Sequence, residues 1–148
     1  ILSHQVLPGS FEINSILQLE IEKQIMFLRL LGIANDEPLV VYHSYFPAST
    51  GARLLEIARG KEKQEEPFTS YELYLEQEEI SPAFVDQTFE AAPADDEIAG
   101  LLNVPKASPL FVISSVVFSA DNIPLEYKQA FYRGDKYKFC ITRQAPQR

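Results

Sequence analysis

The chain has 148 residues, of which 46% are hydrophobic and 23% charged, a composition typical of one globular domain that buries its own core. Its formal net charge of −8 argues against strong nucleic-acid binding by this chain, because such proteins carry a basic face. The single cysteine, Cys140, excludes an intrachain disulfide. It lies in the apolar run KFCIT, so we expect it to be buried in a reduced, cytoplasmic protein.

The longest mainly apolar run, residues 110–118, is too short to span a bilayer. The first residues lack the basic start of a signal peptide. The sequence also begins without Met, from which we expect a further N-terminal segment.

Taken in chain order, the predicted elements form the same unit twice. Residues 11–47 contain a short helix, a β-rich strand, the turn NDEP and a second strand. Residues 96–134 repeat this order, with Ile98 matching Ile13 and DNIP matching NDEP. This repetition predicts an α+β fold, in which an antiparallel sheet is built from two pseudo-repeated halves and helices pack on one side of it.

Other segments separate the two copies. They are a helix over 48–60 ended by Gly60, a charged loop over 61–67, a helix over 69–77 and a strand over 82–92. Thr69 and Glu72 have the spacing of a capping box at the start of the third of these segments. The helix of the second copy follows over 94–102, with acidic residues at its start, where they are favoured.

The motifs do not indicate an enzyme. His4 and His43 lack the spacing of a metal site, and one cysteine cannot supply a thiolate cluster. There is no Gly-rich phosphate loop and no nucleophile elbow in the sequence. We therefore expect neither a metal nor a cofactor, and we interpret His43 as a residue of the sheet.

Several polar residues are candidates for ligand binding. Arg29 interrupts the apolar strand IMFLRLL, so it either forms a salt bridge or holds an anion. Glu126, just after the second turn, has the same two interpretations. The helix start at residues 69–71 offers backbone N–H groups and hydroxyls that either cap the helix or hold an anion. Tyr132 alternates with Phe131, so one of these rings faces the core and the other a pocket.

The segment AFYRGDKYKF contains the tripeptide Arg133-Gly134-Asp135, which in an extracellular protein would suggest integrin adhesion. We interpret it as structural. Gly134 allows a bulge or a close approach of two backbones, and the two charged residues pair locally or across the sheet.

Together these pieces resemble a known family. The pieces that carry the resemblance are, in order, an arginine within a strand, NDEP, SYFP, TSYELYL and IPLEYKQAFYRGDKYKF, followed by Arg143. With them the chain resembles the UTRA domain of HutC-type GntR transcription regulators. The resemblance covers nearly the whole chain. It implies a chorismate-lyase-like fold, a homodimer and a winged helix-turn-helix DNA-binding domain before residue 1. It also implies a small-molecule effector, such as a sugar, a sugar phosphate or a small organic acid.

The resemblance also implies a set of effector-binding residues. Relatives that sense sugar phosphates place charged side chains at positions occupied here by Phe27, Tyr42 and Phe84. This replacement favours a less charged, flatter or partly apolar ligand. The predicted site comprises Arg29, Tyr42, Thr69, Tyr71, Phe84, Glu126 and Tyr132.

The expected mechanism is allosteric, with ligand binding altering operator affinity. Two alternatives stay open at this point: a chorismate-lyase-like enzyme that shares the fold, and a dimerisation module without a ligand.

Overall fold

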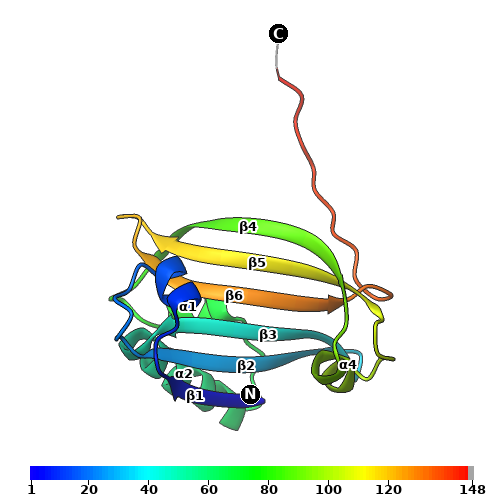
Figure 1. The fold of residues 1–148 in the computed structure, drawn as a ribbon, viewed down its shortest axis with the longest axis horizontal. Helices are drawn as coiled ribbons and strands as arrows, with labels where there is room; N and C mark the ends of the chain where they lie inside the picture. The colour runs from blue at the N-terminus through cyan, green and yellow to red at the C-terminus, as the bar shows by residue number, and fades with distance from the viewer. Residues whose placement is uncertain (147–148) are drawn as a thin grey trace.

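The computed structural model describes residues 1–146, in which one six-stranded antiparallel sheet carries four helices (Figure 1). The strand order across the sheet is β1-β2-β3-β6-β5-β4. The elements in chain order are β1 (Ser3–Leu7), α1 (Phe11–Ile16), β2 (Ile25–Ala34), β3 (Glu37–Pro47), α2 (Ala48–Lys63), α3 (Ser70–Leu75), β4 (Pro82–Pro93), α4 (Asp96–Leu102), β5 (Pro109–Ser119) and β6 (Pro124–Arg133).

The predicted repeat is confirmed. The unit β1-α1-β2-β3 recurs as β4-α4-β5-β6, with α2 and α3 inserted between the two copies. Strands β3 and β6 pair at the centre, from Val40 opposite Tyr132 to Tyr45 opposite Tyr127. The pseudo-twofold relation therefore passes between them, and β1 and β4 form the two edges (Figure 1). Strand β1 was not predicted from the sequence.

Tight turns join the strands of each hairpin. Asn35 and Asp36, between β2 and β3, have φ angles of 51° and 63°. Two successive residues with positive φ form the type I′ turn, whose twist matches that of a hairpin. In the second copy Asn122 takes a φ of 60°. Asn and Asp tolerate this conformation better than other non-glycine residues, which explains why they occur at both turns.

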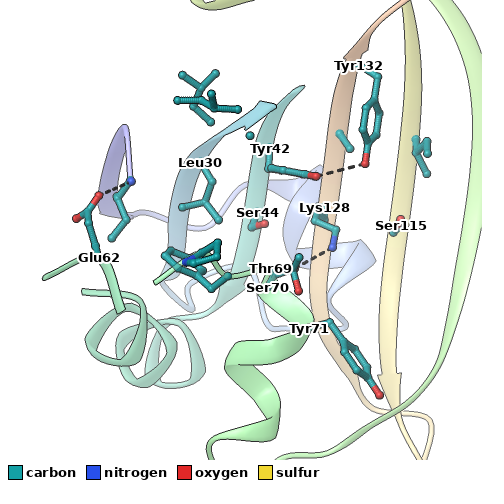
Figure 2. Close-up of a pocket in the computed structure, with 18 of the residues that line it drawn as sticks. Leu30, Tyr42, Ser44, Glu62, Thr69, Ser70, Tyr71, Ser115, Lys128 and Tyr132 are labelled. Atoms are coloured by element: carbon teal, nitrogen blue, oxygen red, sulfur yellow. Dashed lines mark hydrogen bonds and ion pairs between the residues drawn. The ribbon is translucent and has the colours of Figure 1, made fainter. Parts of the chain in front are cut away.

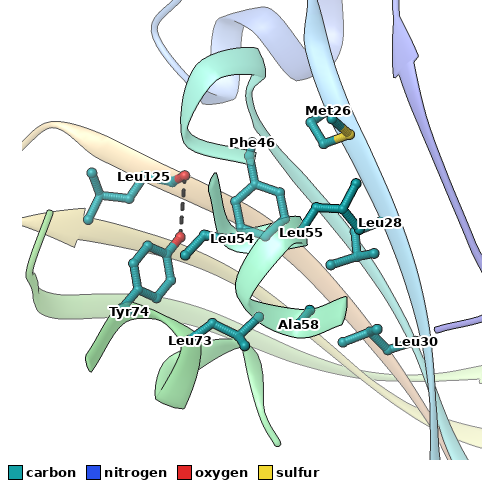
Figure 3. Packing of buried hydrophobic residues seen from close by; sticks show 10 residues of the cluster. All are labelled: Met26, Leu28, Leu30, Phe46, Leu54, Leu55, Ala58, Leu73, Tyr74 and Leu125. Carbon is teal, nitrogen blue, oxygen red and sulfur yellow. Dashed lines mark hydrogen bonds between the residues drawn. The ribbon is translucent and has the colours of Figure 1, made fainter. Parts of the chain in front are cut away.

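Helices lie on both faces of the sheet, so the prediction that they pack on one side was wrong. Leu28 and Leu30 of β2 contact α2 and α3 on one side, which we call the α2–α3 face (Figure 3). Val41 and Val112 contact α4 on the other, the α1–α4 face. Because side chains of a strand alternate between faces, each central strand supplies residues to both layers.

The core of the α2–α3 face is well buried. Phe46, Leu54, Leu73 and Leu28 are each at most 1% exposed, and Tyr74 is 2% exposed (Figure 3). Burying one such side chain contributes about 1.5–3 kcal/mol. This contribution fixes α2 and α3 over the sheet and so positions the segment between them.

One predicted helix end and one predicted burial need correction. Helix α2 does not end at Gly60 but continues to Lys63, into the predicted loop. A glycine inside a helix costs only about 1 kcal/mol, and Lys61 anchors the last turn through ion pairs with Glu66 and Glu76. The prediction that Cys140 is buried was also wrong. Strand β6 ends at Arg133, and the ring of Phe139 still packs against those of Phe89 and Phe111. The chain then extends outward (Figure 1), and Cys140 is exposed.

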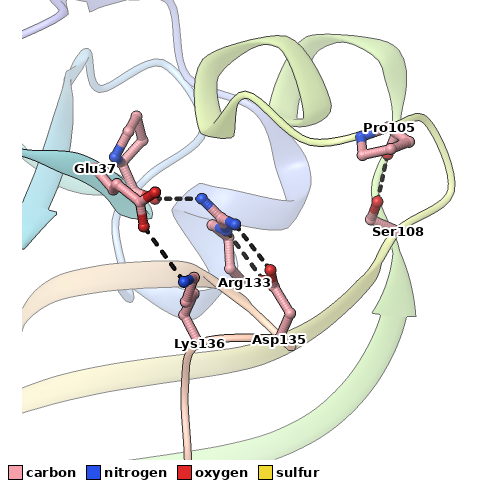
Figure 4. Close-up of polar contacts among 7 residues, drawn as sticks. Glu37, Pro105, Ser108, Arg133, Asp135 and Lys136 are labelled. Atoms are coloured by element: carbon pink, nitrogen blue, oxygen red, sulfur yellow. Dashed lines mark hydrogen bonds and ion pairs between the residues drawn. The ribbon is translucent and has the colours of Figure 1, made fainter.

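The Arg-Gly-Asp tripeptide closes the end of β6 (Figure 4). Arg133 donates two hydrogen bonds to Asp135, of 3.0 and 2.8 Å, and a third, of 3.3 Å, to the carbonyl of Pro38. A Cβ on Gly134 would lie 2.6 Å from the carbonyl oxygen of Pro109. The glycine is therefore required for a close approach of backbones, as the sequence predicted, and the arginine joins β6 to the start of β3.

Candidate functional site

A row of polar side chains crosses the α2–α3 face. Ser44 of β3 lies opposite Lys128 of β6, which lies opposite Ser115 of β5, and Ser115 lies opposite Gln87 of β4. Residues paired in this way point to the same face of the sheet. Gln87 Nε2 donates a 3.0 Å hydrogen bond to Ser115 Oγ. We call these four residues the polar row.

Aromatic and apolar side chains flank the polar row on one side. Tyr42 and Tyr132 lie there, with their hydroxyl oxygens 3.3 Å apart and their rings edge to face (Figure 2). Burial, and then the hydrogen bond to Tyr42, raise the pKa of Tyr132. The Tyr132 hydroxyl therefore remains a neutral group at physiological pH, able to donate or accept a hydrogen bond.

Two adjoining cavities lie over this face. The larger has a volume of about 720 Å³ and the smaller about 270 Å³. Both are bordered by Ser70 and Tyr71 of α3 and by three residues of the polar row, Gln87, Ser115 and Lys128. Their combined size is that of pockets which hold small metabolites.

Glu126 borders the smaller cavity on the other side of the polar row. It is 0% exposed, and neither of its carboxylate oxygens has a hydrogen-bond partner within residues 1–146. The hydroxyl of the neighbouring Tyr74 is directed to the carbonyl of Leu125 instead, at 3.5 Å (Figure 3). Burial, then the charge of Glu126 and the closeness of its carboxylate to the Tyr74 hydroxyl, raise the pKa of Tyr74. The hydroxyl is thus within reach of the carboxylate, but by geometry it is directed to Leu125 and leaves both carboxylate oxygens unpaired. An unpaired buried carboxylate is costly, so this group is suited to accept hydrogen bonds from a ligand.

Lys128 lies between the two cavities at the centre of the polar row. Its Nζ donates a 2.8 Å hydrogen bond to Ser70 Oγ and lies 6.0 Å from the centre of the Tyr42 ring (Figure 2). Sequence reasoning missed this residue. Its position two residues after Glu126 on the same strand was the available signal, since alternate residues share a face.

Six of the seven predicted site residues border the cavities. Tyr42, Thr69, Tyr71 and Tyr132 line the larger one. Tyr71 also lines the smaller one, together with Phe84 and Glu126. Phe84 lies at the sheet edge, 44% exposed, with its ring stacked on that of Phe118.

Arg29 lies elsewhere. It is adjacent in sequence to Leu30, which faces α2, and so it points to the opposite α1–α4 face. There its NH1 group forms a 2.8 Å ion pair with Glu97 of α4. Of the two interpretations of Arg29, the structure shows the salt bridge, and Arg29 itself lines neither cavity.

Thr69 forms a capping box rather than an open anion site. Its side chain accepts from the backbone N–H of Glu72 at 3.3 Å, and its own backbone N–H donates to the Glu72 carboxylate at 2.7 Å. These groups are already used within a helix of six residues. Thr69 therefore contributes to the cavity wall, while its backbone N–H already donates to Glu72.

Neither a metal cluster nor a membrane helix is found among residues 1–146. No group of three or more His, Cys, Asp or Glu side chains is placed to hold a metal ion. No helix in the same range is long and apolar enough to cross a membrane.

Comparison with known proteins identifies the same fold in transcription regulators. The structure superposes on the ligand-binding domain of a GntR-family transcriptional regulator from Bordetella bronchiseptica with a TM-score of 0.83, at 22% identity, covering 97% of this chain and 86% of that one. PhnF from Mycobacterium smegmatis also gives 0.83, at 18% identity, with coverage of 98% and 61%. These likenesses support the fold.

The sequence comparisons are more specific. The chain is 24% identical over 139 residues to the HTH-type transcriptional repressor NagR of Bacillus subtilis (strain 168). The match covers 94% of this chain and 54% of NagR, so the chain spans about half the length of that relative. The model of the UTRA domain matches residues 1–138. The chain therefore belongs to the UTRA domain family, and it is an effector-binding domain of a GntR-type transcription regulator and not an enzyme.

Proposed function

We propose that this domain binds its effector in the two adjoining cavities of the α2–α3 face and transmits binding to a DNA-binding domain that precedes it in the whole regulator. The observation that carries this proposal is the unpaired carboxylate of Glu126 at a cavity wall. A protein that served only for dimerisation would gain stability by replacing such a group with an apolar one. Its presence favours a ligand that satisfies it.

The cavity walls suggest how binding is transmitted. One wall is the rigid sheet, while the other is the segment from Glu65 to Tyr71, which connects α2 with α3. A ligand that contacts both walls stabilises one position of this segment relative to the sheet. The coupling free energy between ligand and operator can be no larger than the difference between the ligand's binding free energies for the two arrangements.

The assembly that this mechanism requires is a cytoplasmic homodimer. Two DNA-binding domains would then contact half-sites about one helical turn apart, so a small change in their spacing alters affinity. The edge strands β1 and β4 and the α1–α4 face are the parts of the sheet available for the second copy.

Operator binding by the full-length regulator tests the proposal. A ligand that binds the domain should change operator affinity by about 5- to 150-fold, the usual range of allosteric coupling. Fluorescence anisotropy with labelled operator DNA, with and without saturating ligand, measures this change. An operator affinity that is the same at saturating ligand would refute transmission, although it would leave ligand binding intact.

A further inference from the structure

We propose that Lys128 selects the charge of the effector, and that the effector is a small acid carrying one carboxylate together with hydroxyl or amino groups. This inference rests on the function proposed above and concerns the same two cavities.

Lys128 is the single lysine or arginine lining either cavity in residues 1–146. Its ammonium group has three N–H donors, and the hydrogen bond to Ser70 uses one of them. Within the described residues no carboxylate lies in ion-pair range of this group, although Glu126 is on the same strand and face. The ammonium group is thus a cation without a counter-ion, located where two cavities meet.

The neighbours of Lys128 suit a carboxylate. Ser44 and Ser115 lie on either side of it in the polar row. Ser44 is 0% exposed, and its Oγ has no hydrogen-bond partner among residues 1–146. A carboxylate beside Lys128 would accept from the ammonium group and from a serine hydroxyl, which gives the short, charge-assisted hydrogen bonds that stabilise a buried anion.

The charge of the cavity walls limits the ligand to about one negative charge. Carboxylates also line the cavities: Glu62, Glu65 and Glu66 the larger one, and Glu126 the smaller one. Glu62 is paired with the Ile1 ammonium group and Glu66 with Lys61, so Glu65 and Glu126 are the acids of the lining without an ion pair among residues 1–146, against the single side-chain cation of Lys128. A phosphate ester with two negative charges would leave one charge uncompensated in an acidic surrounding, which is unfavourable away from bulk water. A single carboxylate matches the single ammonium group.

Glu126 defines the rest of the ligand. It precedes Lys128 by two residues on the same face, so the two positions are separated by about 6–7 Å along the strand. Both line the smaller cavity. The unpaired oxygens of Glu126 require hydrogen-bond donors a few bonds away from the ligand carboxylate. Sugar acids supply these donors as hydroxyls and amino acids supply them as an ammonium group.

Matched pairs of probes test the inference by thermal shift of this chain. Each pair exchanges a carboxylate for a neutral CH₂OH group: glucuronate against glucose, gluconate against glucitol, and serine against serinol. Glucose 6-phosphate represents the dianion. We expect the acid of at least one pair to raise the melting temperature and its partner without a carboxylate not to do so. The pair that responds distinguishes sugar acids from amino acids.

Three variants separate charge selection from structural roles. Lys128→Met should abolish the preference for the acid, while Lys128→Arg should retain most of it. Ser70→Ala removes the hydrogen bond to Lys128 but keeps the charge, so it should keep the preference. Lys106→Met, at an exposed lysine paired with Asp96 near α4, changes the net charge equally and serves as the matched control.

The outcomes are decisive in both directions. The inference is overturned if the partners without a carboxylate stabilise the chain as much as the acids, if glucose 6-phosphate stabilises it more, or if Lys128→Met keeps the preference. It also fails if no member of any pair binds. In each of these cases the proposed function is judged separately, by whether any metabolite of another class binds and loses its effect in Glu126→Leu.

Discussion

Replacing Glu126 with leucine should stabilise the unliganded domain. The carboxylate is 0% exposed and its two oxygens have no hydrogen-bond partner among residues 1–146. A buried polar group left unsatisfied costs about 1–3 kcal/mol, and more when it is charged. Leucine has a similar volume and carries no such cost. We therefore expect the free energy of unfolding to rise by about 1–3 kcal/mol.

Urea denaturation followed by circular dichroism measures this change. For a domain of this size, each kcal/mol corresponds to roughly 2–4 °C in melting temperature, so a parallel thermal scan provides a check. Glu126→Gln is the matched control, because it removes the charge but keeps a polar group, and it should stabilise the domain less than leucine. The same Glu126→Leu variant should lose the response to effector. This result is expected if the carboxylate is retained for ligand binding although it lowers the stability of the unliganded domain.

The opposite result would refute the reasoning. If Glu126→Leu destabilises the domain by more than about 1 kcal/mol, a typical net hydrogen-bond contribution, then the carboxylate is engaged in the unliganded state. Glu126 would then be a structural residue, and the cavity beside it would lose its main argument for a ligand.

Three further predictions concern stability. Gly134→Ala should destabilise the domain by about 1–3 kcal/mol in urea denaturation, because the new Cβ would collide with the carbonyl of Pro109; an unchanged midpoint would show that the backbones separate freely. Stability should fall above pH 10, because burial raises the pKa of Tyr74 and the unfolded chain releases that proton first; Tyr74→Phe should reduce the slope of the urea midpoint against pH. Stability should also fall as pH decreases from 7 to 5, because burial and then Arg29 lower the pKa of His43, and the unfolded state binds the proton more readily; a His43→Gln variant with the same pH profile would contradict this.

The sequence predicted the parts of the fold that depend on local chemistry. The repeat was visible because each hairpin carries its own turn residues, and Asn35, Asp36 and Asn122 all take positive φ angles. The capping box of α3 was visible because Thr69 and Glu72 have a fixed spacing. Elements that form only by pairing with another strand were harder to predict from the sequence. Strand β1 is one of them, since it is recognisable only by its pairing with β2, from Ser3 opposite Arg29 to Leu7 opposite Ile25.

Most residues predicted for the site line the two cavities, but the sequence did not predict the distribution of charge around them. Arg29 was included because an arginine within an apolar strand needs a partner, yet a shift of one residue decides which face it reaches. Helices cover both faces, so hydrophobic neighbours did not reveal which face holds the cavities. Lys128 was overlooked for the same reason, since only the pairing of β6 with β3 and β5 places it between Ser44 and Ser115.

Cys140 shows the limit of composition alone. An apolar run predicts burial only if another element covers it. Residues 138–146 form no strand, and although the ring of Phe139 packs on the sheet, Cys140 beside it is exposed (Figure 1).

The most direct test of the effector site is a thermal-shift screen of the chain and of Glu126→Leu against sugars, sugar phosphates, sugar acids, amino acids, urocanate and fatty acids. A ligand at 100 times its dissociation constant stabilises the native state by about 2.7 kcal/mol, which is readily detected. The proposed site predicts at least one metabolite that stabilises the wild-type chain and has no effect on Glu126→Leu. A metabolite that stabilises both chains equally, or a screen in which none stabilises the wild-type chain, would contradict it.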